Sequence, residues 1–135
     1  MAAGLYNFTI EQGSTVDFEL QYKDSNGSPI DLTGCWGAMQ IRNNYADNKP
    51  TTYITLTTDL NIDKTGLSFS GSVSNSPVSP SNGIIGVYIS ACSSSLLNFN
   101  NARYDLEIYS GDPSCPVVTR LLEGQVQLSK EITRI

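Results

Sequence analysis

Two pairs of acidic side chains have a spacing that could support acid–base chemistry. Asp17 with Glu19, and Asp105 with Glu107, lie two residues apart in segments that alternate apolar and polar residues. Residues i and i+2 of a β-strand point to the same face, and two carboxyl groups on one face are what glycoside hydrolysis requires. The same spacing is typical of the solvated face of an amphipathic strand. Because no aromatic platform for a sugar accompanies either pair, we expect a solvated face and not a catalytic pair.

A metal site is the second kind of chemistry to consider. The run 59–63, Asp-Leu-Asn-Ile-Asp, places oxygen-bearing side chains at alternate positions, as at the start of a calcium loop. Lys64 and Thr65 follow, however, where such a loop needs a glycine and later a glutamate. The sequence has no histidine, and no Cys-x-x-Cys spacing exists for zinc. We therefore expect no metal and no other cofactor.

The cysteines and serines also lack the partners that catalysis needs. Cys35, Cys92 and Cys115 are far apart and odd in number, so we expect buried, reduced thiols, with one disulfide as the alternative left open. No Gly-x-Ser-x-Gly motif is present, and no histidine could activate a serine. The sequence indicates that the protein is not an enzyme and has no small-molecule substrate. Trp36 is more typical of a core residue than of a ligand-stacking one.

Size and charge exclude several classes of partner. The chain has 135 residues, which is typical of one domain, and we expect residues 1–135 to form a single one. Its net charge of −5 repels phosphate, so we expect neither nucleic acid nor an anionic membrane surface as a partner. The first residues have no basic cluster followed by an apolar stretch, and the apolar run 84–89 is too short to span a bilayer. We expect folding in a cytosol.

Strand patterns follow one another along most of the chain. Tyr104 to Tyr109 alternates apolar with charged residues, and Val16 to Lys23 alternates in the same way. Further strands are expected near residues 6–10, 35–42, 53–56, 67–73, 84–89 and 117–128. A short helical turn is expected near 91–97, capped by Ser90, with inward-facing apolar side chains at Leu96, Leu97 and Phe99. About eight short strands without any βαβ alternation indicate an all-β sandwich or barrel.

Several motifs together resemble a known family. They are Phe8 to Gly13, Pro29 to Gly34, Met39 to Arg42, YDLEIYSG at 104–111, RLLEG at 120–124 and EITR at 131–134. The chain resembles small virion structural proteins of tailed bacteriophages that have an immunoglobulin-like β-sandwich. Its first half is also similar, more loosely, to the N-terminal adaptor domain of phage baseplate upper proteins. The resemblance implies one immunoglobulin-like antiparallel β-sandwich of about eight strands, with no catalytic residues. The sequence departs from the family at 35–37 and in a longer loop at 112–116.

The resemblance also implies a function. We expect a non-enzymatic structural protein of a tailed phage particle, which docks other virion proteins at the tail, the baseplate or the fibre attachment. Its partners would be other virion proteins and copies of itself, and its location would be the virion, assembled in the host cytoplasm. One alternative is a head-decoration or neck protein. Another is a carbohydrate- or receptor-binding module that uses Trp36, Tyr45 and Tyr53 for stacking.

Three regions are the expected contact surfaces: the N-terminal strand (Tyr6 to Ile10), the proline-rich loop (Ser74 to Asn82) and the C-terminal segment (Glu131 to Ile135). Edge strands offer unpaired backbone groups to a partner. The individual residues expected at interfaces are Tyr6, Phe8, Ile10, Pro77, Pro80, Glu131, Thr133, Arg134 and Ile135. Arg120, Arg134 and Glu123 lie in an apolar context, where they either form a structural ion pair or meet a neighbouring subunit.

Overall fold

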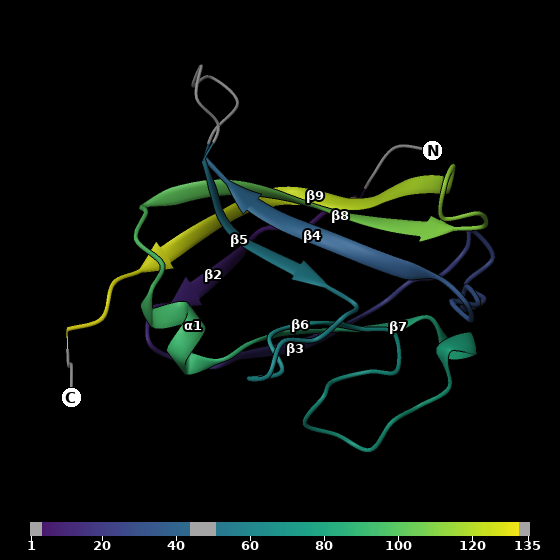
Figure 1. The fold of residues 1–135 in the computed structure, drawn as a ribbon, viewed down its shortest axis with the longest axis horizontal. Coiled ribbons are helices and arrows are strands. Elements are labelled where there is room, and N and C mark those ends of the chain that lie inside the picture. The colour runs from purple at the N-terminus through teal and green to yellow at the C-terminus, as the bar shows by residue number, and fades with distance from the viewer. Residues whose placement is uncertain (1–3, 44–50, 133–135) are drawn as a thin grey trace.

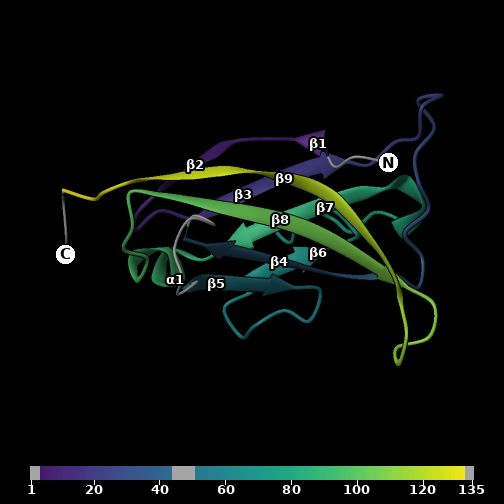
Figure 2. The same cartoon turned by 90° about the horizontal axis from the view of Figure 1, so that it is seen from above.

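Two β-sheets pack face to face in the computed structural model, which describes residues 4–43 and 51–132 (Figures 1 and 2). The larger sheet has the strand order β1-β9-β8-β4-β5, and β2 also pairs with β9. The smaller sheet has the order β3-β7-β6. The strands are β1 (Gly4–Leu5), β2 (Phe8–Glu11), β3 (Val16–Gln21), β4 (Trp36–Arg42), β5 (Thr52–Thr57), β6 (Gly66–Ser68), β7 (Ile84–Ile89), β8 (Asn101–Ser110) and β9 (Val117–Ser129).

The strand order is that of an immunoglobulin-like sandwich, which confirms the predicted fold class. Strands β3, β7 and β6 stand in the order of immunoglobulin strands B, E and D, and β4, β8 and β9 in the order of C, F and G. One part of the prediction was wrong, because the sandwich is not purely antiparallel. Strands β1 and β2 pair in parallel with β9, with Phe8 opposite Val126 and Ile10 opposite Leu128. The larger sheet is therefore mixed.

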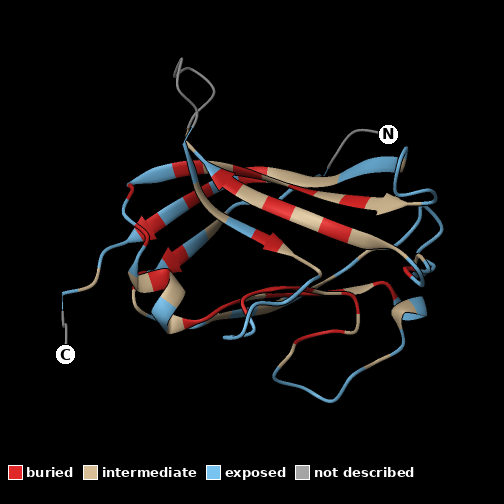
Figure 3. Cartoon of the chain, in the orientation of Figure 1, coloured by how far each residue is buried: buried red, intermediate tan, exposed pale blue. Residues whose placement is uncertain are grey.

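The core lies between the sheets and follows the period-2 pattern of the sequence. Along β8, Ala102, Tyr104, Leu106 and Ile108 are buried while the residues between them are partly exposed (Figure 3). The buried residues of β7 and β2 and the inward residues of β4 close the same core. The aromatic ring of Phe8 lies 5.4 Å from that of Phe18 and 5.1 Å from that of Tyr104, between centroids. These contacts join the N-terminal strand to both sheets.

A buried polar cluster closes one end of the sandwich. The side chain of Gln12 donates to the carbonyl of Leu97 at 2.7 Å and accepts from the backbone N–H of Glu131 at 3.0 Å. The hydroxyl of Ser94, fully buried, donates to the carbonyl of Ser14 at 2.7 Å. Satisfied groups of this kind avoid the cost of burying a polar atom without a partner. They tie the N-terminal strand, the helical turn and the end of β9 together.

The helical turn is α1 (Ala91–Ser95), as predicted, and the hydroxyl of Ser90 caps it by accepting from the N–H of Ser93 at 3.0 Å. Leu97 and Phe99 are buried, as expected. The expectation for Leu96 was wrong: its side chain is 84% exposed, because this residue ends the helix on the solvent side. The predicted loop at 74–82 contains one 3-10 turn, Pro80–Asn82. No helix within residues 4–43 and 51–132 is long and apolar enough to cross a membrane.

The three cysteines are free thiols, but the expected burial was wrong. Cys35 is partly exposed, and Cys92 and Cys115 are exposed. Cys92 lies in the short helix α1, and Cys115 lies in the turn between β8 and β9. Both positions are at the surface because they belong to connections, and connections run over the outside of a sandwich.

Candidate docking surfaces

The carboxylates of Asp17 and Glu19 hold a loop. The hydroxyl of Ser72 donates to Asp17 at 2.5 Å, and the backbone N–H of Ser72 donates to Glu19 at 2.7 Å. These bonds fix the segment after β6 against the outer side of β3. Asp105, of the second pair, lies 3.5 Å from the guanidinium of Arg120. Asp17, Glu19 and Asp105 thus each contact another part of the protein.

Asp63 holds the helical turn in place. Its carboxylate accepts from the hydroxyls of Ser90 at 2.6 Å and Ser93 at 2.7 Å, and from the N–H of Thr65 at 3.1 Å. These donors, Ser90 first, hold the pKa of Asp63 well below its usual value. No group of three or more acidic or cysteine side chains that could hold a metal occurs in the described part of the chain.

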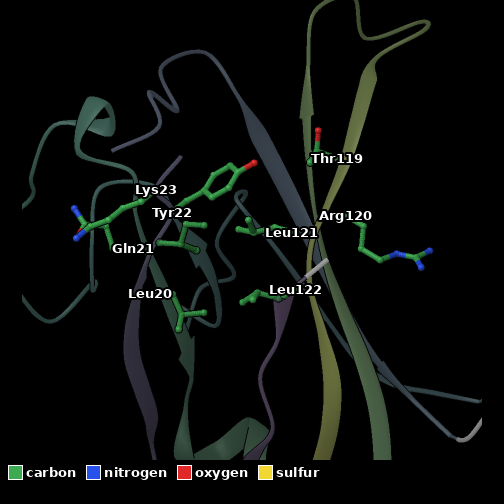
Figure 4. A pocket seen from close by; sticks show the side chains of 10 residues that line it. Leu20, Gln21, Tyr22, Lys23, Thr119, Arg120, Leu121 and Leu122 are labelled. Carbon is green, nitrogen blue, oxygen red and sulfur yellow. The ribbon is translucent and has the colours of Figure 1, made fainter. Parts of the chain in front are cut away.

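An apolar groove opens between the two sheets, where the edge strand β3 faces β1 and β9. Its volume is about 360 Å³. Its walls are the side chains of Leu20, Tyr22, Ile85, Leu121 and Leu122. Figure 4 shows Leu121 and Leu122 projecting from β9 toward the side that carries Leu20 and Tyr22. We refer to this space as the edge groove.

A β-bulge in β9 builds one wall of the edge groove. Leu122 is opposite Leu106 and Arg120 is opposite Glu107, so Leu121 is an extra residue without a partner across the pair. A bulge of this kind re-aims side chains. As a result the two neighbouring leucines both face the groove, while Arg120 lines its rim and its side chain extends to the other side (Figure 4).

A glycine next to Leu122 keeps space in the groove. Gly4 of β1 lines the groove, and a Cβ added there would lie 3.2 Å from the Cδ2 atom of Leu122. Leu5, the next residue, is 76% exposed.

Charged groups stand on the rim of the groove and on the adjoining sheet face. Arg120 forms the structural ion pair foreseen as one alternative: its Nη1 atom lies 3.9 Å from Glu123, in addition to the contact with Asp105. The Arg120 side chain is 51% exposed, so these pairs add little stability. Arg134 lies outside the described residues.

A row of partly exposed and exposed apolar side chains crosses the outer face of the larger sheet. Trp36 is opposite Tyr109 in the β4–β8 pair, and Tyr109 is opposite Val118 in the β8–β9 pair. The rings of Trp36 and Tyr109 stack at 6.1 Å between centroids, and Val118 is 47% exposed. We name Trp36, Tyr109 and Val118 the aromatic row. Partly exposed Trp and Tyr side chains are among the residue types that contribute most to protein interfaces.

The expectation that Trp36 is a core residue was wrong. This residue lies on the solvent face of β4, while Gly37, Met39 and Ile41 face the core. Burial raises the pKa of the Tyr109 phenol, and the negative charges of Glu107 and Asp105 raise it further. The row thus lies near Asp105 and Glu107, and Arg120 lies 3.5 Å from Asp105.

The predicted N-terminal contact residues differ in exposure. Tyr6 is 39% exposed, and its ring lies 6.2 Å from that of Phe8, which is partly buried against the core. Ile10 is fully buried, so its side chain cannot be a contact residue. Strand β2 directs Ile10 inward because the strand period alternates faces. Tyr6 keeps the accessibility that a contact requires.

The predicted contacts in the loop and at the C-terminal segment are accessible where they are described. Pro77 is exposed, Pro80 is partly exposed, and Glu131 is partly exposed. Thr133, Arg134 and Ile135 lie outside the described residues. Ile132, which was not singled out, is 98% exposed.

The residues of the proposed sugar platform do not come together. Tyr53 stacks on the buried ring of Phe99 at 4.7 Å. It lies near the start of β5, which runs antiparallel to β4, whereas Trp36 lies at the start of β4. The two aromatics are therefore at opposite ends of the strand pair. Tyr45 lies outside the described residues.

Comparison with known proteins supports the fold. No family model matches the chain, and no curated protein matches it in sequence. The N-terminal domain of phage TP901-1 ORF48 is similar in structure, with a TM-score of 0.50 and 8% sequence identity, over 96% of this chain and 100% of that one. A chicken T-cell receptor structure is similar at a TM-score of 0.46 and 11% identity, over 94% of this chain and 54% of the other. The chain thus shares the fold of a phage protein domain.

Proposed function

We propose that this chain is a non-enzymatic structural protein of a tailed phage particle that docks other virion proteins at the tail, the baseplate or the fibre attachment. The aromatic row is the observation that carries the proposal. Trp36 and Tyr109, both partly exposed, lie with the exposed Val118 on the outer face of the larger sheet. A partly exposed Trp–Tyr pair on a rigid sheet is suited to a protein interface.

Two further observations support this function. The similarity to the phage TP901-1 ORF48 domain extends over the whole of that domain. In addition, the acidic side chains that could have formed a catalytic pair bind Ser72 and Arg120 instead. A chain whose acidic groups bind its own loop and strand, and which carries partly exposed aromatic side chains, fits a docking module better than an enzyme.

Mass spectrometry of purified particles tests the proposal. Particles are isolated by density gradient from a culture that produces this chain, and heads and tails are then separated. We expect peptides of this chain in the tail fraction, at a fixed ratio to the other tail proteins. Recovery in the head fraction would favour a head-decoration or neck protein, and absence from both fractions would contradict the proposal.

Substitutions in the aromatic row test whether this surface docks other virion proteins. Trp36→Ala and Tyr109→Ala are expected to reduce incorporation into particles while the isolated protein keeps its circular-dichroism spectrum, because both side chains face solvent. Thr55→Ala on the exposed face of β5 is the control and is expected to incorporate normally. Normal incorporation of both aromatic variants would exclude this face as the docking surface.

A further inference from the structure

The smaller sheet has one strand fewer than its counterpart in an immunoglobulin constant-type domain. That counterpart has the strand order A, B, E and D, and here β3, β7 and β6 supply B, E and D. The N-terminal strands β1 and β2 come where strand A is expected in the chain, but they pair with β9 of the larger sheet. Within residues 4–43 and 51–132, β7 is therefore the one strand that pairs with β3, and the other edge of β3 has no strand beside it.

The core is open along this edge of β3. The inward-facing side chains of Val16, Phe18 and Leu20 remain partly exposed, whereas those of the neighbouring strand β7 are at most 1% exposed. The ring of Tyr6 packs against that of Phe18, with 6.0 Å between centroids. The edge groove continues the opening toward Leu20 and Tyr22. A strand added beside β3 would cover apolar surface that the chain itself leaves exposed.

The edge groove can accept side chains from such a strand. Its volume of about 360 Å³ is at the small end of the ~300–1,000 Å³ range of ligand pockets, which is enough for one or two apolar side chains. Because successive side chains of a strand point to opposite faces, every second residue of the added strand would face the groove. An unpaired edge beside a side-chain pocket is the arrangement by which a sheet binds an extended segment.

The other face of the added strand would meet two carboxylates. Asp17 and Glu19 are exposed on the outer face of β3, where they accept hydrogen bonds from Ser72. Neither forms an ion pair with a basic residue in the part of the chain that the structure describes. Side chains directly opposite each other on neighbouring strands lie about 4.5–5.5 Å apart, so basic residues of the added strand would be attracted there and acidic residues repelled.

A second copy of β3 is a poor occupant for the same reason. Pairing of two β3 edges would bring Asp17 and Glu19 of one copy beside the same two carboxylates of the other. The net charge of the whole chain, −5, adds to this repulsion. The charges therefore favour a basic strand from a different protein.

We propose that the open edge of β3 binds a β-strand of another virion protein in which apolar residues alternate with lysine or arginine. The apolar side chains enter the edge groove against Leu20 and Leu122, and the basic side chains lie beside Asp17 and Glu19. The added strand takes the place of strand A in the smaller sheet. This inference rests on the proposed function and deepens it by naming the chemistry of one partner. Because the two carboxylates are exposed, they select the partner more than they tighten its binding.

Two variants separate the contribution of the groove from that of the charges. Gly4→Leu fills the groove from β1, where the nearest atom is the flexible end of the Leu122 side chain. Asp17→Asn combined with Glu19→Gln removes both charges and keeps the oxygen atoms that accept from Ser72.

Each variant has a matched control. Thr55→Leu adds an apolar side chain on the exposed face of β5. Asp59→Asn combined with Asp112→Asn changes the net charge by the same amount, at two exposed positions outside the strands. Circular dichroism of every variant verifies that it is folded.

NMR titration of the isotope-labelled full chain with synthetic peptides is the first test. The probe is a capped peptide that alternates Val and Lys, and the comparison peptide alternates Val and Glu. The Val–Lys peptide is expected to shift the backbone N–H signals of β3. Loss of both charges should weaken this binding about 2- to 10-fold, and Gly4→Leu should weaken it at least as much. The two controls are expected to bind as the wild type does.

Hydrogen exchange of the chain inside purified particles tests the same edge with its natural partner. The backbone N–H groups of β3 are expected to exchange more slowly in particles than in the isolated chain. Strand β7 is the internal reference, because it already has a strand on each side.

Three results would overturn the proposal. They are a Val–Lys peptide that shifts β3 no more than the Val–Glu peptide does, exchange of β3 that is equally fast in particles and in isolation, and exchange of β3 that slows as the isolated chain is concentrated. The last result would make a second copy the occupant. Failure here is separable from failure of the proposed function. A chain found in particles with a freely exchanging β3 refutes only the added strand, whereas a chain that binds the Val–Lys peptide but is absent from particles refutes only the virion role.

Discussion

The hydroxyl of Tyr104, on the buried face of β8, donates a hydrogen bond to the backbone carbonyl of Tyr6 at 2.5 Å. Tyr6 lies between β1 and β2, and its N–H in turn donates to the carbonyl of Glu123 at 3.0 Å. This pair of bonds fixes the N-terminal segment, including the strand β1 that borders the edge groove. The single hydroxyl of Tyr104 therefore connects the core to a candidate docking surface.

Replacement of Tyr104 by Phe is expected to lower the free energy of unfolding by about 1–2 kcal/mol, because the carbonyl of Tyr6 loses its partner while the packing of the ring is kept. Urea unfolding measures the change. Tyr88→Phe on β7, a partly exposed tyrosine, is the control and is expected to change stability by less than half as much. Equal effects of the two substitutions would show that the bond to Tyr6 adds nothing.

The same tyrosine makes the fold sensitive to alkaline pH. Burial, with a smaller contribution from Tyr6, raises the pKa of Tyr104 well above its usual value of 10.0. The folded state therefore keeps the proton while the unfolded chain releases it near pH 10. The stabilisation is fully present below that pH and is lost as pH rises toward the folded-state pKa. Melting temperatures measured at rising pH should fall less steeply above pH 10 in Tyr104→Phe than in the wild type.

Asp63 should make the stability of the fold depend on pH in the acidic range. Because the hydroxyls of Ser90 and Ser93 lower its pKa below 3.8, its contribution is present above that pH and is lost as pH falls toward the folded-state value. Asp63→Asn is expected to melt earlier than the wild type at neutral pH and to converge with it in acid. Asp59→Asn, in the same loop, should follow the wild type throughout. Melting temperatures of Asp63→Asn and the wild type that differ by the same amount at every pH would refute the stabilising role of the Asp63 carboxylate.

Gly86 should be intolerant of a side chain. A Cβ at this position of β7 would overlap the carbonyl oxygen of Gly71, in the loop that Asp17 and Glu19 hold. Gly86→Ala is expected to cost about 1–3 kcal/mol through forced displacement of that loop. Hydrogen exchange should increase at the backbone N–H of Ser72. Ser72→Ala, which removes the bond to Asp17 without a clash, should loosen the same loop; unchanged exchange in both variants would contradict this account.

The alternating patterns predicted the strands well because burial on one face leaves a period of two in the sequence. Residues 104–109 lie within β8, and the predicted strand 84–89 has the bounds of β7. The direction of pairing was not predictable in this way. Side-chain alternation at Phe8 and Ile10 is the same whether the neighbour is parallel or antiparallel, so the parallel pairing with β9 left no mark in the pattern.

The surface position of Trp36 could not be predicted from the pattern of apolar residues either. Both faces of β4 carry apolar residues, and periodicity alone does not say which face is dry. Packing decides it: a Cβ on Gly37 would lie 2.8 Å from the ring of Phe69, so the face of the glycine is the crowded one. The sequence did hold one signal for the edge groove. The doublet Leu121-Leu122 interrupts an alternating strand, as a bulge does.

A cryo-EM map of the intact particle tests the central claim most directly. We predict a two-sheet density for each copy of the chain, with the aromatic row of Trp36, Tyr109 and Val118 covered by a neighbouring virion protein. A map in which this row faces open solvent in every copy, or in which no such sandwich occurs, would contradict the account.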